Sequence, residues 1–193
     1  MQIKDEAKRK KIIEVATKLF KERDIHSVKL DEIAQIVGIS KSSIYTYYKS
    51  KNELFFSCLT EGIDEFIDCI NKATNKMNFN SGFEQMIKFL LKIARIKGPL
   101  MAILFKNGPA LKLSDEDMEK QRKRKLRGME MLENFFQKGV KEGILAPDIP
   151  VKRMAIVFQS MFPINVEMML YGEEPLTCEQ IYRMFMSVFK KQE

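Results

Sequence analysis

The chain has 193 residues, of which 45% are hydrophobic and 31% are charged, and its formal net charge is +7. This balance fits an ordinary globular protein, either one compact domain or a small head with a larger body. Three widely spaced cysteines and a single histidine argue against a disulfide framework and a transition-metal site, so we expect neither a metal nor a cofactor.

Basic residues gather near the N-terminus. Residues 1–52 contain 12 Lys or Arg and 7 Asp or Glu, so this quarter of the chain holds +5 of the net charge. The excess predicts a polyanion such as DNA as the partner, and an anionic membrane surface is the alternative. No signal peptide is recognisable, and the longest apolar run, residues 100–105, is far shorter than the ~20 residues that cross a bilayer. We therefore expect a cytoplasmic protein that is not bound to a membrane.

Residues 4–23 are predicted to form the first helix. Ile12, Ala16, Leu19 and Phe20 lie on one stripe at helical spacing. The cations at 8–11 form the outer face, which is either a solvated surface or a contact to DNA phosphates.

Residues 30–48 are predicted to form a helix-turn-helix. Apolar residues at i, i+3, i+4 and i+7 predict a helix over 30–37. Gly38 then ends it, because glycine adopts the left-handed conformation at little steric cost. Ser40 can cap a second helix, in which Ile44 and Tyr48 would anchor one side to the core. A helix, a short turn with glycine and a second short helix make up the unit.

The other side of this second helix carries small polar groups. A lysine, short hydroxyls and a phenol can donate to phosphates and base edges without holding the helix out of a major groove. The face is therefore either a DNA-reading surface or the solvated face of a small amphipathic helix. The residues are Lys41, Ser42, Ser43, Tyr45 and Thr46.

The segment GISKSSIYTYYKSKNELF, residues 38–55, resembles the signature of the TetR family of bacterial transcriptional regulators, and the match is closest over residues 8–56. The resemblance implies an all-α fold of about nine helices. An N-terminal three-helix bundle would contain the helix-turn-helix, and a larger C-terminal helical body would bind a ligand and dimerise. We accordingly expect a DNA-binding domain at 1–50 and an effector-binding and dimerisation domain at 51–193.

Two positions depart from the family pattern. Where the family has a glycine, this chain has Asp24, which can still adopt the left-handed conformation. Where the family has a capping Thr or Ser, the chain has Lys29. Lysine cannot cap a helix by accepting amide hydrogen bonds, but it can meet a phosphate.

The resemblance implies that the residues facing DNA are Lys29, Lys41, Ser42, Ser43, Tyr45, Thr46, Tyr47 and Lys51. We assign base reading mainly to Lys41, Ser42 and Thr46. The two tyrosines and Lys51 would position the protein on the DNA backbone. Lys51 would hold a phosphate together with the amide groups at the start of its helix.

The body is predicted to consist of helices. A capping box from Ser50 to Glu53 opens a long helix to about residue 76. Further helices are expected at 83–97, 100–105, 114–142, 151–171 and 177–190. Within 114–142, the basic run KQRKRKLR at 120–127 is either solvated helix surface or a contact to an acidic ligand, DNA or a partner.

The helix at 151–171 is apolar on every side, which indicates burial on every side. In a chain of this size, one face can meet the core while another meets a second copy. The last helix has the stripe Ile181, Phe185, Val188 and Phe189. Two such helices per subunit could form a four-helix interface across a two-fold axis, and the resemblance likewise implies a homodimer.

An effector is expected to bind within the body. The candidate lining residues are Met86, Phe89, Leu90, Ile93, Met101, Phe105, Met129, Leu132, Phe135, Phe136, Phe158, Phe162 and Glu167. Each apolar member is either a lining residue or simply core. Glu167 and Asn165 interrupt an apolar helix. A buried carboxylate would need a partner such as a cationic effector, whereas an exposed glutamate, or one paired with a lysine, would not.

The chain contains no recognisable catalytic motif, so we do not expect an enzyme. We predict a ligand-responsive transcriptional regulator, a repressor by the resemblance, that binds a palindromic operator as a dimer and is released by a small, largely apolar effector. The alternative is a DNA-binding regulator or nucleoid-associated protein that has no small-molecule effector and is controlled by a protein partner.

Overall fold

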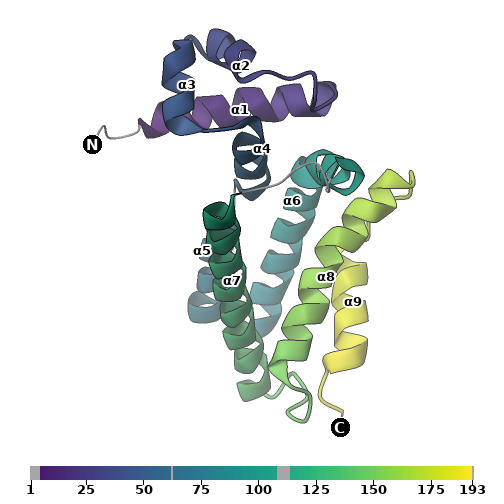
Figure 1. The fold of residues 1–193 in the computed structure, drawn as a ribbon. Helices are drawn as coiled ribbons and strands as arrows, with labels where there is room; N and C mark the ends of the chain where they lie inside the picture. Colours follow the sequence, from purple (N-terminus) through teal and green to yellow (C-terminus); the bar gives the residue numbers. More distant parts are fainter. Residues whose placement is uncertain (1–4, 62, 108–113, 193) are drawn as a thin grey trace. The chain divides into compact units, whose positions relative to one another are not determined.

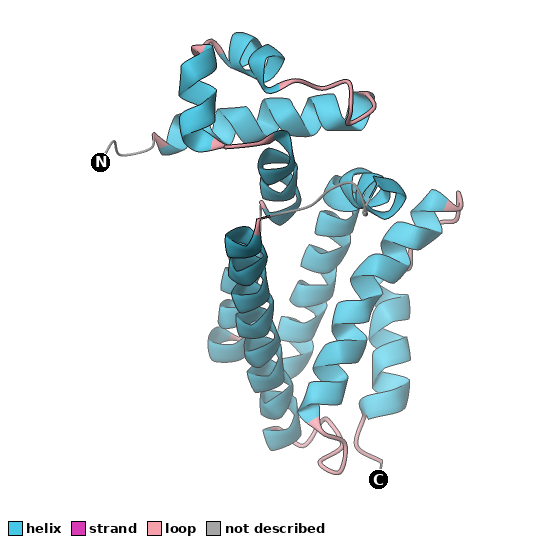
Figure 2. Cartoon of the chain, in the orientation of Figure 1, coloured by secondary structure: helices cyan, strands magenta, loops and turns pink. Residues whose placement is uncertain are grey.

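The computed structural model describes residues 5–61, 63–107 and 114–192. In these ranges the chain forms helices and no strand, with one isolated bridge between Leu145 and Lys190 (Figures 1 and 2). The predicted all-α fold is confirmed. Of the helices in these ranges, none combines the length and the apolar character that crossing a bilayer requires.

Packing divides the chain into two compact units. Unit 1 comprises Met1–Glu61 and Pro99–Met118, and unit 2 comprises Gly62–Gly98 and Glu119–Glu193. The domain boundary expected after residue 50 stays a prediction.

Unit 1 begins with α1 (Glu6–Glu22), α2 (Leu30–Val37), α3 (Lys41–Tyr47) and α4 (Lys51–Thr60). Their apolar sides meet in one core, in which Ile33 and Ile44 are fully buried. The rings of Phe20 and Phe55 pack edge to face there, with their centroids 5.3 Å apart. Apolar contacts therefore hold α1 and the helix-turn-helix, which consists of α2 and α3, to α4.

The helix ends of unit 1 follow local signals in the sequence. Gly38 has a φ of 82° and ends α2, because this left-handed conformation favours glycine. Ser40 Oγ accepts a hydrogen bond from the amide of Ser43 at 3.1 Å and caps α3. Both predicted helix ends are confirmed.

The turn after α1 differs from the expectation. Asp24 does not adopt the left-handed conformation, since among the described residues only glycines have positive φ. Its Oδ1 instead accepts the His26 amide at 2.7 Å, and its carbonyl accepts the Ser27 hydroxyl at 2.7 Å. A side-chain hydrogen bond thus closes the turn, and no special backbone conformation is needed.

Unit 2 is built from α5 (Ile63–Lys76), most of α6 (Phe79–Asn107) and of α7 (Asp115–Lys141), α8 (Val151–Leu170) and α9 (Cys178–Phe189). Phenylalanine rings fill its core. Phe83 lies 4.7 Å from Phe185 and 5.5 Å from Phe158 between ring centroids, and Phe136 lies 5.0 Å from Phe185. Such ring clusters bury large apolar areas and account for much of the stability of a small helical body.

The single helix predicted from residue 50 to 76 is wrong, because the structure has two. α4 ends at Thr60, and Glu61 has φ −59° and ψ 130°, outside the helical region. α5 then begins at Ile63. The non-helical backbone of Glu61 therefore ends α4. Apolar spacing continues across this point, so periodicity alone conceals the break.

The two helices predicted at 83–97 and 100–105 are also wrong, because α6 is continuous through Pro99. Ala94 and Leu100, on either side of the proline, are both buried. This packing outweighs the hydrogen bond that proline removes from the helix. α6 also starts four residues early, since Phe79 is fully buried and its amide donates to Glu142 Oε2 at 2.9 Å.

Candidate nucleic-acid interface

One side of α3 is fixed to the core of unit 1. Ile44 is fully buried, and Tyr48, directly after the helix, is 4% exposed. The hydroxyl of Tyr48 has no hydrogen-bond partner among the described residues, and burial raises the pKa of this phenol. These two residues anchor the helix and turn its other side toward solvent.

The solvent side of α3 carries the side chains that the sequence predicts to face DNA. Lys41, Ser42, Tyr45 and Thr46 are exposed, and Ser43 and Tyr47 are half-buried. The Oγ atom of Ser40 forms hydrogen bonds with the hydroxyls of Ser42 and Ser43, at 3.0 and 2.7 Å. α3 thus carries all six predicted residues on the sides that Ile44 and Tyr48 leave uncovered.

Thr46 is oriented by the helix itself. Its Oγ1 donates to the backbone carbonyl of Ser43 at 2.7 Å. The bond uses the hydroxyl proton and leaves the lone pairs and the methyl group facing outward. This arrangement suits an acceptor contact or an apolar contact to a base.

Lys29 lies at the start of α2, where the sequence predicts a phosphate contact. It is exposed, and within the described part of the chain its side chain makes no capping hydrogen bond. The first amide groups of α2 therefore have no side-chain cap from this position. Uncapped amides beside a lysine form a site that suits an anion.

Lys51 has an internal role that sequence reasoning did not anticipate. Its Nζ donates to the carbonyl oxygens of Ile25 at 2.6 Å and His26 at 3.1 Å. Burial lowers the pKa of this lysine. The ammonium thus joins α4 to the turn between α1 and α2, and a phosphate contact would rely on its third donor.

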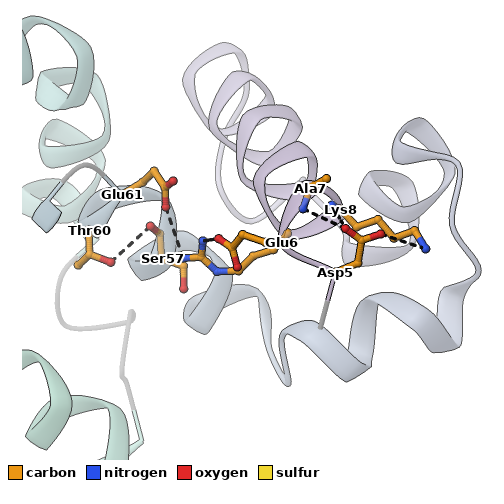
Figure 3. Close-up of polar contacts among 8 residues, drawn as sticks. Asp5, Glu6, Ala7, Lys8, Ser57, Thr60 and Glu61 are labelled. Atoms are coloured by element: carbon orange, nitrogen blue, oxygen red, sulfur yellow. Dashed lines mark hydrogen bonds and ion pairs between the residues drawn. The ribbon is translucent and has the colours of Figure 1, made fainter. Parts of the chain in front are cut away.

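The basic run on α1 divides into two kinds of residue. Lys8, Lys10 and Lys11 are exposed. Arg9 instead donates to Glu6 at 2.8 Å and to Glu61, directly after α4, at 3.5 Å. Figure 3 shows these two glutamates. Arg9 therefore links α1 to α4, whereas the three lysines stay exposed, Lys8 in an ion pair with Asp5 at 3.5 Å.

The sequence analysis did not predict a role for Asp31, which lies in α2 beside the predicted DNA-facing residues of α3. Its Oδ2 lies 2.6 Å from Nζ of Lys41, so the first turns of α2 and α3 are joined by an ion pair. The hydrogen bond to Asp31 and the charge of its carboxylate raise the pKa of Lys41. The two residues are ten apart in sequence, and only the angle between the helices makes them neighbours.

Most candidate effector residues lie in the core of unit 2. Those buried in its core cluster are Met86, Leu90, Leu132, Phe135, Phe136 and Phe158. Those packed against it and partly buried are Phe89, Met129 and Phe162. This is how core residues pack, and their contact with a ligand stays a prediction.

The remaining candidates are more scattered. Ile93 is half-buried, Met101 belongs to the segment assigned to unit 1, and the side chain of Phe105 lies outside the described residues. Glu167 is exposed, whereas Asn165 is fully buried. Of these two polar residues of α8, Asn165 and not Glu167 therefore faces the interior.

Part of α8 and α9 is exposed, although the sequence indicates burial on every side of α8. Ile156 and Ile164 of α8 are 49% and 41% exposed, and Met184 and Val188 of α9 are 47% and 61% exposed. Val188, predicted to share the buried stripe of Phe185, is instead exposed, whereas Phe185 is buried. The residues that the structure describes leave these four apolar side chains exposed to solvent.

Comparison with known proteins shows that the N-terminal part of the chain matches a family model. Residues 12–58 match the model of the bacterial regulatory proteins of the tetR family. YfiR, an HTH-type transcriptional regulator of Bacillus subtilis, is 22% identical over 164 residues, which cover 84% of this chain and 80% of YfiR.

Solved structures share the fold over nearly the whole chain. A transcriptional regulator from Saccharomonospora viridis in complex with choline has a TM-score of 0.72 at 15% identity, covering 97% of this chain and 99% of that one. AibR, in complex with isovaleryl coenzyme A and operator DNA, has a TM-score of 0.64 at 19% identity, covering 94% and 97%. All eight predicted DNA-facing residues fall inside the matched segment 12–58. Residues 12–58 therefore carry the N-terminal domain of the tetR family of bacterial regulatory proteins, and the described chain has the fold of TetR-family transcriptional regulators.

Proposed function

We propose that the protein is a transcriptional repressor that binds a palindromic operator as a homodimer and leaves it when a small, largely apolar effector binds to unit 2. The observation that carries the proposal is the exposed polar face of α3, held outward by the burial of Ile44 and Tyr48. AibR, which has the same fold, was solved with operator DNA. The site of action would be the cytoplasm, where bacterial DNA lies.

On DNA, α3 enters the major groove and the surrounding cations meet the backbone. Lys41, Ser42 and Thr46 read bases, because their exposed donors and acceptors project from the free face of the helix. Lys29 and the uncapped start of α2 bind one phosphate. The tyrosines of α3 and the exposed lysines of α1 contact others, so affinity depends on salt.

The homodimer is proposed from the uncovered sides of α8 and α9. Ile156, Ile164, Met184 and Val188 would be buried when the two helices of one protomer meet those of another across a two-fold axis. Two copies of α3 would then reach successive turns of the major groove, which requires a palindromic operator.

Release by an effector is a shift between two populations of the dimer. The effector must bind better to the dimer whose two α3 helices do not match the spacing of the grooves, since equal affinity for both forms changes nothing. The apolar interior of unit 2 suits an apolar ligand, and Asn165 offers it one buried amide. The related regulators in complex with choline and with isovaleryl coenzyme A support control by a small molecule.

A titration of the protein's own upstream DNA, followed by fluorescence anisotropy at several salt concentrations, tests the proposal. We expect a dimer to bind one palindromic segment with an affinity that falls steeply as salt rises. A thermal-shift screen of apolar metabolites then supplies effector candidates, which are added to the preformed complex. Absent or salt-insensitive binding would overturn the DNA-binding role. DNA binding that no small molecule releases would favour control by a protein partner.

A further inference from the structure

The ion pair between Asp31 and Lys41 lies on the proposed DNA-reading face. Lys41 is the first residue of α3 and Asp31 the second residue of α2. Nζ and Oδ2 are 2.6 Å apart, and the two side chains are 69% and 44% exposed. The lysine assigned to base reading is thus already held by a carboxylate before DNA arrives.

The other oxygen of this carboxylate is turned inward. Asp31 Oδ1 is buried and has no hydrogen-bond partner among the residues that the structure describes. The oxygen that remains accessible is Oδ2, and Lys41 occupies it. Lys41 therefore takes a lone pair of the accessible oxygen of Asp31, and this hydrogen bond lets the carboxylate act on DNA through the lysine.

The neighbouring acid behaves differently. Glu32, also in the first turn of α2, forms an ion pair with Arg23 at the end of α1. Of two adjacent carboxylates, one is bound to α1 and the other to α3. The charge of Asp31 therefore acts on α3, whereas the charge of Glu32 connects α2 to the end of α1.

We propose that Asp31 determines operator specificity by positioning Lys41 over a guanine in each half-site. The inference rests on the proposed function, in which α3 reads bases. A lysine on a flexible stem is a point charge that can follow the nearest phosphate. The carboxylate confines this ammonium and repels phosphates, so the lysine is directed to the uncharged acceptors O6 and N7 of guanine.

The pair also lowers the affinity for DNA of any other sequence. A lysine already neutralised by a carboxylate displaces fewer counterions from the backbone than an unpaired lysine does. Asp31 thus weakens binding to non-operator DNA while it keeps Lys41 in place for the correct base. Discrimination rises because the competing contact is penalised.

The test compares Asp31→Asn with Glu32→Gln, which removes the same charge one residue away. The probes are a duplex selected by the wild-type protein from a random pool, its single-base variants, and an unselected duplex. For Asp31→Asn we expect tighter binding to the unselected duplex, a salt slope steeper by about one counterion, and a loss of about tenfold in discrimination at one guanine position. For Glu32→Gln we expect unchanged discrimination at that position.

Lys41→Ala and the double variant assign the effect to the lysine. Lys41→Ala should lose the same guanine preference, and Asp31→Asn should add nothing in that background. The inference is overturned if Asp31→Asn keeps the wild-type preference, or if it still alters the preference without Lys41. If Lys41→Ala loses the preference and Asp31→Asn does not, the inference about Asp31 fails while the proposed base-reading role of Lys41 stands. If Lys41→Ala changes no preference, the proposed base-reading role fails as well. Thermal unfolding confirms folding, and Asp31→Ser is a second variant if Asp31→Asn is unfolded.

Discussion

The ammonium of Lys51 lies 2.6 Å from the carbonyl oxygen of Ile25, so the first residue of α4 is bound to the turn that precedes α2. The turn leads directly into the proposed phosphate site at Lys29. The lysine that the family resemblance assigns to a phosphate therefore also holds the helix-turn-helix in place. Replacing Lys51 should therefore lower both the stability of the protein and its affinity for DNA.

Lys51→Ala should lower the free energy of unfolding by about 1 kcal/mol, because two backbone carbonyls lose a charged donor. DNA affinity should fall by a similar factor on every duplex, since the contact carries no base information. Chemical denaturation and anisotropy titrations measure the two effects. Lys49→Ala removes an equal charge from an exposed position and should leave stability unchanged. A Lys51→Ala loss confined to particular base pairs would contradict this division of roles.

Thr46→Ala should weaken binding selectively, at particular base pairs of the operator. The hydroxyl is held by the carbonyl of Ser43 and projects from the exposed face of α3. A lost base contact costs about tenfold in affinity at the affected position. Titration of single-base variants of the selected duplex measures it. Thr46→Ser retains the hydroxyl and shows whether the methyl group or the oxygen is read. Equal losses of affinity on all duplexes would show that Thr46 contacts the DNA backbone and not a base.

Val188→Glu should give monomers that remain folded. Val188 is 61% exposed in one chain, so a charge there meets water in the monomer but is buried in the proposed interface. Sedimentation velocity measures the mass, and circular dichroism the helix content. Phe185→Glu is the contrasting variant. Phe185 is 1% exposed among the rings of Phe83 and Phe136, so this change should unfold unit 2. A Val188→Glu protein that remains dimeric would place the interface elsewhere.

Two glycines of α7 should respond in opposite directions to alanine. A Cβ at Gly139 would lie 2.7 Å from the ring of the buried Phe79, so Gly139→Ala should destabilise the protein by about 1–3 kcal/mol. A Cβ at Gly128 meets no described atom within 4 Å. Gly128→Ala should therefore stabilise the helix by about 0.5–1 kcal/mol. Thermal unfolding of both variants tests the packing of α6 against α7. Stabilisation by Gly139→Ala would show that Phe79 is not held there.

Signals that act within a few residues were enough to predict much of unit 1. Gly38 ends a helix because of its own backbone freedom, and Ser40 caps the next because its hydroxyl reaches an amide three residues on. Ile44 and Tyr48 share one face at helical spacing, which leaves the polar face of α3 exposed. These relationships are local, so the sequence alone contains them.

Tertiary packing decided the rest. α6 continues through Pro99 because buried residues on both sides hold it, and no local signal reports their burial. Phe185 and Val188 share an apolar stripe in the sequence, yet only packing against other helices decides which of them is inside. The pairing of Asp31 with Lys41 depends on the angle between α2 and α3. Sequence by itself determined the resemblance to the tetR family, the helical fold and the exposed polar residues of α3, because capping and periodicity are properties of neighbouring residues. The partners of Lys41 and Lys51 and the exposed side of α9 were decided by structure, since they join residues that only folding brings together.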